Sequence, residues 1–439
     1  MKLNYRLKKT TWFGFDSIDA VTQPFVQTKR PIKLSVITQF FPPDFAATGQ
    51  LLDELVRHLG EQGIDVKVFT GQPGYAFRAT NAPIYEKKGL VQIKRSRTSQ
   101  MWPQRIRGKA VNGLIFSVRA ILHLLKNCRR RDLVLITTAP PFLPVLGYLA
   151  HLWFGMPYVC LLYDLYPDIA VELGVVPAQH WVARVWRNVN RLVWRNAEKI
   201  IVLSPAMKQR VISACPDVAD KVSVIHSWAD PERIVPIAKN KNWFAWKHNL
   251  VKKFTVLYSG NMGRCHDMDT ILEAAKRLQD DPIEFVFIGG GAGRDVLIEE
   301  VQQFGLKNFQ FLPYQDKEIL PYSLTACDLS LVSVSPGMEN LVAPSKLYSA
   351  LSAGRPIAVI CSKESYLNQI IKDADCGATF ENGDGQRLAE FIRHLSVDQR
   401  LAENMGNAGR RYLQRHFTPT VIAKQYFGLI NQAFANAWK

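Results

Sequence analysis

Cysteine is scarce in this sequence, and its few copies are not arranged for disulfide or zinc chemistry. Seven cysteines are spread over 439 residues, and no two of them have the Cys-x-x-Cys spacing. Zinc sites need closely spaced ligands, and small disulfide-bonded secreted domains have an even number of cysteines at short intervals. The pattern therefore argues against both classes and indicates a protein of a reducing compartment.

A long, purely apolar helix is also missing. The N-terminus has no apolar core of signal-peptide length. Residues 133–163 contain no Asp, Glu, Lys or Arg, but four prolines, at 140, 141, 144 and 157, interrupt them, whereas a membrane-spanning helix needs about 20 apolar residues in a row. We predict a strand over 133–137, a helix over 144–154 and a strand over 158–163, with both strands buried in a parallel sheet. We expect a cytoplasmic protein.

Acidic residues are outnumbered by basic ones. The chain has 55 Lys and Arg against 38 Asp and Glu, which gives a net charge of +17. Such an excess favours an anionic partner, which is nucleic acid, a membrane surface or a phosphorylated substrate. Because the chain has no zinc-finger, helix-turn-helix or RNA-recognition signature, we do not expect nucleic acid to be the partner.

The order of elements predicts an α/β fold of two Rossmann-like, doubly wound domains in tandem. Strands and helices alternate from residue 33 to about 225, and the alternation restarts at residue 255 after a lysine-rich stretch. Ligands of such sheets bind at the carboxyl ends of the strands, so two facing domains predict a site in the cleft between them. We divide the chain into a basic extension (1–31), a first domain (32–235), a linker (236–253), a second domain (254–415) and a C-terminal amphipathic helix (416–439) that packs back on the first domain.

The second domain contains two glycine-containing loops that suit phosphate binding. The segment YSGNMGR at 258–264 follows a strand, so the backbone at Gly260 and Gly263 can approach phosphate oxygens and Arg264 can add a charged donor fork. An ordinary strand-to-helix turn with a solvent-exposed arginine fits the same letters. The second loop, IGGGAG at 288–293, is at least as consistent with tight packing as with ligand contact.

A third motif places charged residues at the start of a helix. In SPGMENLVAPSKLYSALSAGRPI (335–357), a loop with Glu339 leads into a helix that begins near Ser345 and Lys346. Helix N-termini bind anions, and a glutamate beside one can accept hydrogen bonds from sugar hydroxyls. The alternative is a capped surface helix.

Together these segments resemble glycosyltransferase family 4, the retaining, nucleotide-sugar-dependent enzymes of the GT-B fold. The subgroup that the chain most resembles makes cell-surface polysaccharides such as colanic acid and O-antigen. The resemblance runs from residue 33 to 415, and it is carried by YSGNMGR (258–264), FIGGG (287–291), ACDLSLVSV (326–334), PSKLYSALSAGRPI (344–357), FFPPDFAATG (40–49), LLYDLYPD (161–168) and WRNAEKIIVLSPAMKQRV (194–211).

The resemblance implies a set of site residues and a reaction without a metal or other cofactor. It implies catalytic roles for Asp164 and Glu339, and donor binding by Gly49, Gly260, Gly263, Arg264, Asn340, Leu341, Val342, Ser345, Lys346 and Tyr314. The chain departs from the family at Ser349, where many members have a glutamate, and at Tyr163, where many have a histidine.

Two alternatives remain at this point. The spacings Asp267-Met-Asp269 and Asp373-Ala-Asp375 are possible metal ligands, but we interpret both as structural. A nucleotide-sugar epimerase or a phosphorylase would use the same fold with His266 or Asp164 as the general base.

The positive charge is concentrated in the first domain. Residues 94–131 have eleven basic side chains and no acidic one, with apolar residues at helical spacing between them, and Trp181–Arg195 is a second basic, tryptophan-containing cluster. Such helices lie on anionic membranes, although a core-packing helix with a solvated basic face has the same pattern. We predict a peripheral protein on the inner face of the cytoplasmic membrane that uses a polyprenyl-linked or other glycolipid acceptor and contacts lipid through Arg105, Arg107, Lys109, Arg119, Lys126, Arg129, Arg130 and Arg131.

Overall fold

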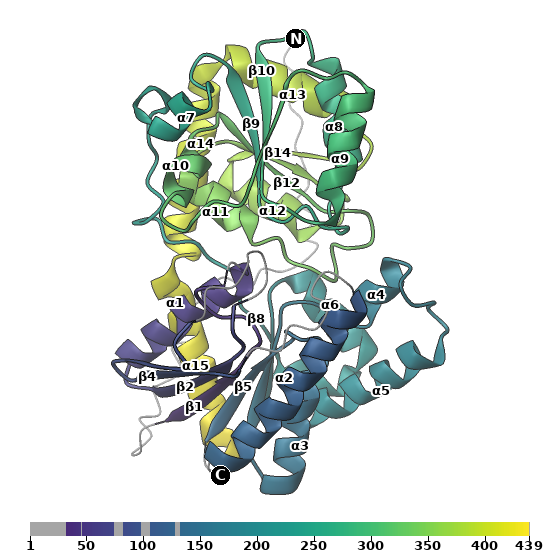
Figure 1. The fold of residues 1–439 in the computed structure, drawn as a ribbon, viewed down its shortest axis with the longest axis vertical. Coiled ribbons are helices and arrows are strands. Elements are labelled where there is room, and N and C mark those ends of the chain that lie inside the picture. Colours follow the sequence, from purple (N-terminus) through teal and green to yellow (C-terminus); the bar gives the residue numbers. More distant parts are fainter. Residues whose placement is uncertain (1–31, 45, 74–81, 98–105, 128–131, 439) are drawn as a thin grey trace, which may run out of the picture.

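The computed structural model describes residues 32–44, 46–73, 82–97, 106–127 and 132–438. The chain forms two α/β units stacked one above the other, each built on its own sheet (Figure 1). The predicted fold class is therefore confirmed. The predicted extension 1–31 lies outside the described residues.

The first sheet has eight strands in the order β3-β4-β2-β1-β5-β6-β7-β8. All neighbours are parallel except β3 and β4, an antiparallel pair that the sequence did not reveal. The strands are β1 (Lys33–Ile37), β2 (Asp65–Thr70), β3 (Tyr85–Lys88), β4 (Val91–Arg95), β5 (Leu133–Thr137), β6 (Tyr158–Leu162), β7 (Lys199–Val202) and β8 (Val222–Val224).

The apolar segment 133–163 folds as strand, helix and strand, as predicted. Every residue of β5 and β6 is buried, which explains their continuous apolar character. Across the described ranges, no helix is both long enough and apolar enough to cross a bilayer. The helices of this unit are α1 (Ala47–Glu61), α2 (Ile106–Asn127), α3 (Pro144–Phe154), α4 (Asp168–Glu172), α5 (Trp181–Asn196) and α6 (Pro205–Ala214), followed by the 3₁₀ turn η1 (Pro216–Lys221).

The second sheet has six parallel strands in the order β11-β10-β9-β12-β13-β14. They are β9 (Phe254–Ser259), β10 (Ile283–Ile288), β11 (Phe309–Leu312), β12 (Leu329–Ser333), β13 (Ile357–Ile360) and β14 (Gly377–Phe380). The accompanying helices are α7 (Trp243–Lys247), α8 (Asp269–Arg277), α9 (Ala292–Gln303), α10 (Leu320–Thr325), α11 (Lys346–Ala353), α12 (Tyr366–Ala374), α13 (Gly385–Val397) and α14 (Gln399–His416). The 3₁₀ turn η2 (Lys239–Lys241) precedes α7.

The chain passes between the two units twice. After α14 it returns to the first unit as α15 (Pro419–Ala437), which packs against α1 (Figure 1). The two passages lie side by side, because the amide of Ala229 donates to the carbonyl of Phe417 over 3.2 Å. Arg410 fixes the first passage to the second unit by donating to the carbonyls of Pro231 and Ile234.

Backbone contacts join the units on the other side of the cleft. Asp164, two residues after β6, forms an isolated antiparallel bridge with Val342, and the amide of Leu165 donates to the carbonyl of Leu341 over 3.2 Å. The carboxyl ends of both sheets face the space between the two units.

Candidate functional site

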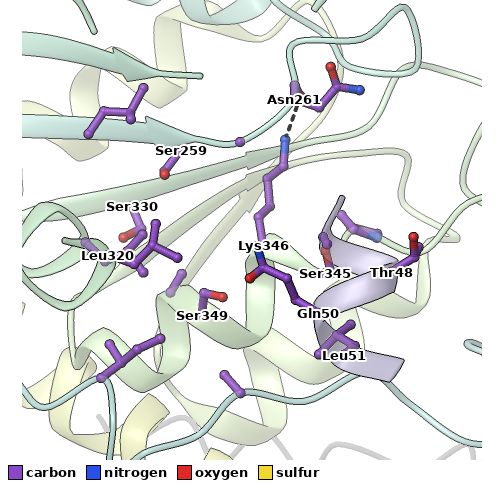
Figure 2. A pocket seen from close by; sticks show the side chains of 18 of the residues that line it. Thr48, Gln50, Leu51, Ser259, Asn261, Leu320, Ser330, Ser345, Lys346 and Ser349 are labelled. Atoms are coloured by element: carbon purple, nitrogen blue, oxygen red, sulfur yellow. Dashed lines mark hydrogen bonds between the residues drawn. The ribbon is translucent and has the colours of Figure 1, made fainter. Parts of the chain in front are cut away.

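A cavity of about 460 Å³ lies between the two units, a size typical of small-molecule sites. Its walls come from the first turns of α1, from Asp164 after β6, from the loops after β9 and β11, and from the start of α11. In each sheet the cavity lies where the strand order reverses, which is where parallel sheets bind ligands. Figure 2 shows α1 and α11 facing each other across it.

Two glycine-containing loops, one after β9 and one after β10, pack against each other at one wall of the cavity. Gly260 has a φ of +133°, and a Cβ on Gly289 would lie 2.1 Å from the Gly260 carbonyl oxygen. The amide of Met262 donates to the carbonyl of Gly290 over 2.7 Å. The three glycines of FIGGG thus allow two loops to meet, and their role in this structure is packing.

Lys346 crosses the cavity from the first turn of α11. Its Nζ contacts the hydroxyl of Tyr258, lies 3.8 Å from the centre of the Tyr258 ring and donates to the carbonyl of Asn261 over 3.4 Å (Figure 2). Burial holds the pKa of the Lys346 ammonium well below its ordinary value. A cation held in this way, next to a helix N-terminus and a glycine loop, is suited to bind an anion.

Asp164 supplies a carboxyl group on the opposite side of the cavity. Its backbone amide is 3.4 Å from the Thr138 hydroxyl, while its carboxyl makes no hydrogen bond or ion pair with any residue that the structure describes. Burial raises the pKa of this carboxyl to about 6. The group therefore changes its charge near neutral pH and is open to a ligand.

His266 lines the same cavity as a neutral imidazole. Its Nδ1 lies 2.8 Å from the Ser333 carbonyl oxygen, and since that oxygen accepts, Nδ1 carries the proton. Burial, with a smaller effect of Lys346, lowers the pKa of His266 to about 3. His266 therefore adds no positive charge to the site.

Seven of the twelve residues predicted for catalysis and donor binding lie around this one cavity. They are Asp164, Gly260, Gly263, Tyr314, Val342, Ser345 and Lys346. Tyr314 lies against the glycine loop and donates from its hydroxyl to the Gly290 carbonyl over 3.3 Å. Ser349, which stands where a glutamate was expected, also faces the cavity (Figure 2).

The other five have different surroundings. Glu339 is buried, and its carboxylate accepts from the amide of Ser362 over 3.2 Å. It therefore supports the loop after β13 and does not line the cavity. Leu341 is buried as well, and it meets the first unit through its carbonyl. The side chains of Asn340 and Arg264 are exposed outside the cavity lining.

Gly49 has a packing role in this structure. A Cβ at this position would lie 2.9 Å from the carbonyl oxygen of Phe40, so α1 can approach the loop after β1 only with glycine here. Its neighbours Thr48 and Gln50 line the cavity. Contact of Gly49 with donor phosphates stays a prediction.

The sequence did not identify a polar cluster at the far end of the cavity. Glu54 of α1 accepts from the indole Nε1 of Trp228 over 3.1 Å and lies 3.5 Å from the Lys317 ammonium. Arg233 donates to the Lys317 carbonyl over 2.5 Å, and burial raises the pKa of Glu54. A usable signal existed: α1 follows β1 at the point where strand order reverses, so its first turns had to reach the cleft.

Asp267 has a structural environment. Its carboxylate accepts from the amide and hydroxyl of Thr270 over 3.0 and 2.6 Å, and from the Asn382 side chain over 2.7 Å. Among the described residues, no group of three or more His, Cys, Asp or Glu side chains is placed to hold a metal ion.

The region predicted to bind membranes has an apolar face. On α2, Leu114, Val118, Leu122 and Leu125 are 43–59% exposed at spacings of four, four and three residues. The end of α3 packs beside α2 and exposes residues 152–154, and a shallow groove joins the two helices. This is a contiguous exposed apolar surface of the kind that marks a binding interface.

Few of the predicted lipid-binding cations can be placed on this face. Arg119 and Lys126 are described, and Arg119 contacts the carbonyl of Arg97. Arg105, Arg129, Arg130 and Arg131, together with the side chains of Arg107 and Lys109, lie outside the described residues.

The tryptophan cluster on α5 is divided between the surface and the protein interior. Trp181 is 68% exposed, whereas Trp194 is buried. Arg187 pairs with Asp168 over 3.0 Å, and Arg195 with Asp217 over 2.8 Å. Part of the basic character of α5 therefore serves ion pairs within the first unit.

Comparison with known proteins matches both halves of the chain. Residues 48–233 match the family model described as Glycosyltransferase Family 4, and residues 240–412 match the model described as Glycosyl transferases group 1. Glycosyltransferase WbjE of Pseudomonas aeruginosa is 26% identical over 324 residues, which is 71% of this chain and 76% of that protein. The colanic acid biosynthesis glycosyl transferase WcaI of Escherichia coli is 26% identical over 356 residues, which is 77% of this chain and 86% of that protein.

Solved structures share the two-domain arrangement. Sucrose-phosphate synthase from Thermosynechococcus elongatus has a TM-score of 0.72 at 18% identity, over 92% of this chain and 100% of that one. HepE of Anabaena, in complex with UDP and glucose, has a TM-score of 0.68 at 16% identity, over 90% of this chain and 98% of that one. This likeness establishes the GT-B fold.

Proposed function

Since the chain belongs to the nucleotide-sugar-dependent glycosyltransferases, with a Family 4 domain followed by a group 1 domain, we propose that it builds a cell-surface polysaccharide. In this proposal it transfers a sugar from a nucleotide-diphosphate sugar to a lipid-linked glycan. The anomeric configuration is retained, and no metal takes part. WbjE and WcaI, one of them named for colanic acid biosynthesis, support the polysaccharide context.

The position of Lys346 is the observation that carries the proposal. A sugar leaves its donor as the diphosphate gains negative charge, so the site must offer positive charge where that group lies. Lys346, the N-terminus of α11 and the backbone at Gly260 converge on one wall of the cavity. UDP bound to the structural neighbour HepE supports a nucleoside diphosphate as the occupant.

The opposite wall suits the sugar and its acceptor. Asp164 has a carboxyl without a partner among the described residues, and the cleft opens between it and the α11 wall. Ser349 stands where the resemblance to family 4 implies a glutamate. We therefore expect Ser349 to bind donor hydroxyls with a single neutral hydrogen bond, and donor affinity to be modest.

A panel of UDP- and GDP-sugars, assayed for hydrolysis and transfer with and without EDTA, tests the reaction. We expect turnover of at least one donor, unchanged by EDTA, and a product with the anomeric configuration of the donor by NMR. No binding of any nucleotide sugar would refute the proposed reaction. Activity that EDTA removes and a divalent ion restores would refute the metal-independent mechanism.

The exposed apolar face of the first unit supports a lipid-linked acceptor. A face with leucine and tryptophan side chains next to basic residues binds anionic bilayers by burying its apolar side chains among the lipid head groups. We propose that α2 and the end of α3 (residues 152–154) lie on the inner face of the cytoplasmic membrane. The acceptor then reaches the cleft from the bilayer, through the domain that carries Asp164.

Flotation with vesicles tests this docking. Burial of one leucine contributes about 1.5–3 kcal/mol, so Leu122→Glu should lower the bound fraction on phosphatidylglycerol vesicles about tenfold or more. Val397→Glu is the matched control, because Val397 is 80% exposed on α13 of the other unit. Equal flotation of both variants, or binding indifferent to lipid charge and salt, would refute the docking surface.

A further inference from the structure

A second exposed surface, made of aromatic rings, lies on α7 and α10 of the second unit. We call it the α7 surface; its rings are Trp243, Trp246 and Tyr322, which are 42%, 57% and 37% exposed. The rings of Trp243 and Tyr322 have their centres 5.5 Å apart and are inclined at 52°. Trp246 follows one helical turn later. Exposed rings of this size, gathered in one place, call for a binding partner.

The scaffold beneath these rings is rigid. Asn242 begins α7 by accepting from the amide of Phe244 over 2.9 Å, and it donates to the Tyr322 carbonyl and the Thr325 hydroxyl of α10 over 2.8 and 3.0 Å. Phe244 is buried, and the indole of Trp246 donates to the carbonyl of Asn240 over 2.7 Å. Four hydrogen bonds hold this segment in place, so little conformational freedom is lost on binding.

The segment that carries α7 is basic. Residues 234–266 contain no Asp or Glu. Lys239 and Lys253 are paired with Asp328 and Glu284. The side chains of three further lysines are exposed and make no ion pair or hydrogen bond with the residues that the structure describes: they are Lys241, Lys247 and Lys252. Lys247 lies 5.9 Å from the centre of the Trp243 ring.

We propose that the α7 surface binds an acidic oligosaccharide, a stretch of glycan whose sugars carry carboxylates. Indole and phenol rings bury the C–H faces of sugar rings, and flexible ammonium groups beside them pair with carboxylates. Rings alone would suit a neutral glycan, and lysines alone would suit any polyanion. The two together, on a fixed scaffold, select a ligand that has both features.

The position of the surface favours a glycan over a bilayer. α7 lies at one margin of the upper unit in Figure 1, whereas α2 and α3, which we propose to contact the bilayer, lie in the lower unit. Leu250, which follows α7, is buried and therefore adds no aliphatic side chain to the surface. On α10, Leu320 and Leu324 line the cavity while Tyr322 belongs to the α7 surface. A glycan held there lies behind the wall of the donor cavity.

The proposal rests on the proposed function for the origin of the glycan, but its test needs neither donor nor transfer. The full chain is titrated with a hexamer of galacturonic acid, with neutral maltohexaose, with hexaglutamate and with phosphatidylglycerol vesicles. We expect the galacturonic acid hexamer to bind and to change tryptophan fluorescence, and the other soluble probes to bind at least about tenfold more weakly.

Variants locate the binding. Trp246→Ala and Trp243→Ala should each weaken hexamer binding about three- to tenfold. Lys247→Gln should also weaken hexamer binding, and it should leave folding and donor turnover unchanged. Trp438→Ala and Lys424→Gln, exposed positions on α15 and at its end, are the controls. Far-UV circular dichroism and donor turnover report on folding.

Three results would overturn the proposal. They are hexamer affinity that the α7 variants leave unchanged, equal affinity for hexaglutamate, which is plain polyanion binding, and loss of vesicle binding in Trp246→Ala with hexamer binding intact. Because donor turnover is measured separately, a failure here leaves the proposed reaction standing, and a failure of the reaction leaves the binding result readable.

Discussion

Replacement of Lys346 by methionine is the sharpest test of the site. Methionine keeps the unbranched stem and removes the ammonium, which contacts Tyr258 and Asn261 and has no carboxylate partner among the described residues. Loss of one charge-assisted hydrogen bond to a diphosphate costs about 1.5–3 kcal/mol. We therefore expect kcat/KM for the donor sugar to fall about 10- to 150-fold.

The stability of the same variant should not fall. Burial lowers the pKa of Lys346 below its ordinary value near 10.5, so the folded chain releases a proton that the unfolded chain keeps. At pH values between the pKa of Lys346 in the folded chain and that in the unfolded chain, unfolding takes up a proton. The free energy of unfolding therefore rises with pH through that interval. Lys346→Met removes this dependence, and at neutral pH it should unfold at the same denaturant concentration as the parent or a higher one.

Proton uptake on donor binding gives a third readout. Two phosphate charges beside Lys346 favour its ammonium form, so binding of UDP or GDP should raise the pKa of Lys346, and the complex should take up protons at pH values between the pKa of the free protein and that of the complex. Calorimetry in two buffers of different ionisation enthalpy measures this uptake, which Lys346→Met should abolish. Lys372→Met, an exposed lysine on α12, is the control. Unchanged donor kinetics in Lys346→Met, or lost stability with intact kinetics, would refute the assignment.

Three further predictions concern other residues of the cavity and its loops. Because burial raises the pKa of Asp164 to about 6, kcat/KM should rise with pH through about 6 as the carboxylate forms. The pH profile of Asp164→Asn should lack this rise, and an unchanged rise would show that another group titrates. Gly289→Ala should lose about 1–3 kcal/mol of stability in urea melts, because its Cβ would lie 2.1 Å from the Gly260 carbonyl oxygen, and it should also lose donor affinity. Gly305→Ala is the control: its Cβ meets open space at φ +63°, so it should keep donor affinity. Arg264→Ala should weaken donor binding in calorimetry about tenfold if the cleft closes around the diphosphate; an unchanged Kd would remove Arg264 from the site.

The sequence was sufficient for most of the fold, because its signals are periodic. The uncharged segment 133–163 was resolved into strand, helix and strand by its prolines, and the resemblance to family 4 was carried by local motifs at β9 and α11. The β3–β4 pair was missed, since β3 is four exposed or half-exposed residues without alternation. Local pattern predicts elements well where one face is buried.

Side-chain direction was harder to predict. Glu339 and Lys346 stand seven residues apart in one motif, yet Lys346 faces the cavity and Glu339 turns to the amide of Ser362, which lies after β13. Nothing within the motif encodes that contact, because it depends on where a later strand ends. For the same reason Glu54 and Arg233 have no local signature, because each of them contacts Lys317 of the second unit.

The return of α15 to the first unit sets an order of events during synthesis. The apolar side of α15, which includes Tyr426 and Ile430, is buried, and α15 packs on α1 near the beginning of the chain. On a ribosome, α1 emerges long before its partner, and the contact waits for nearly the whole chain. The first domain is therefore finished last: its covering helix arrives after the second domain has all its strands, and a nascent chain released early would expose an apolar groove to chaperones.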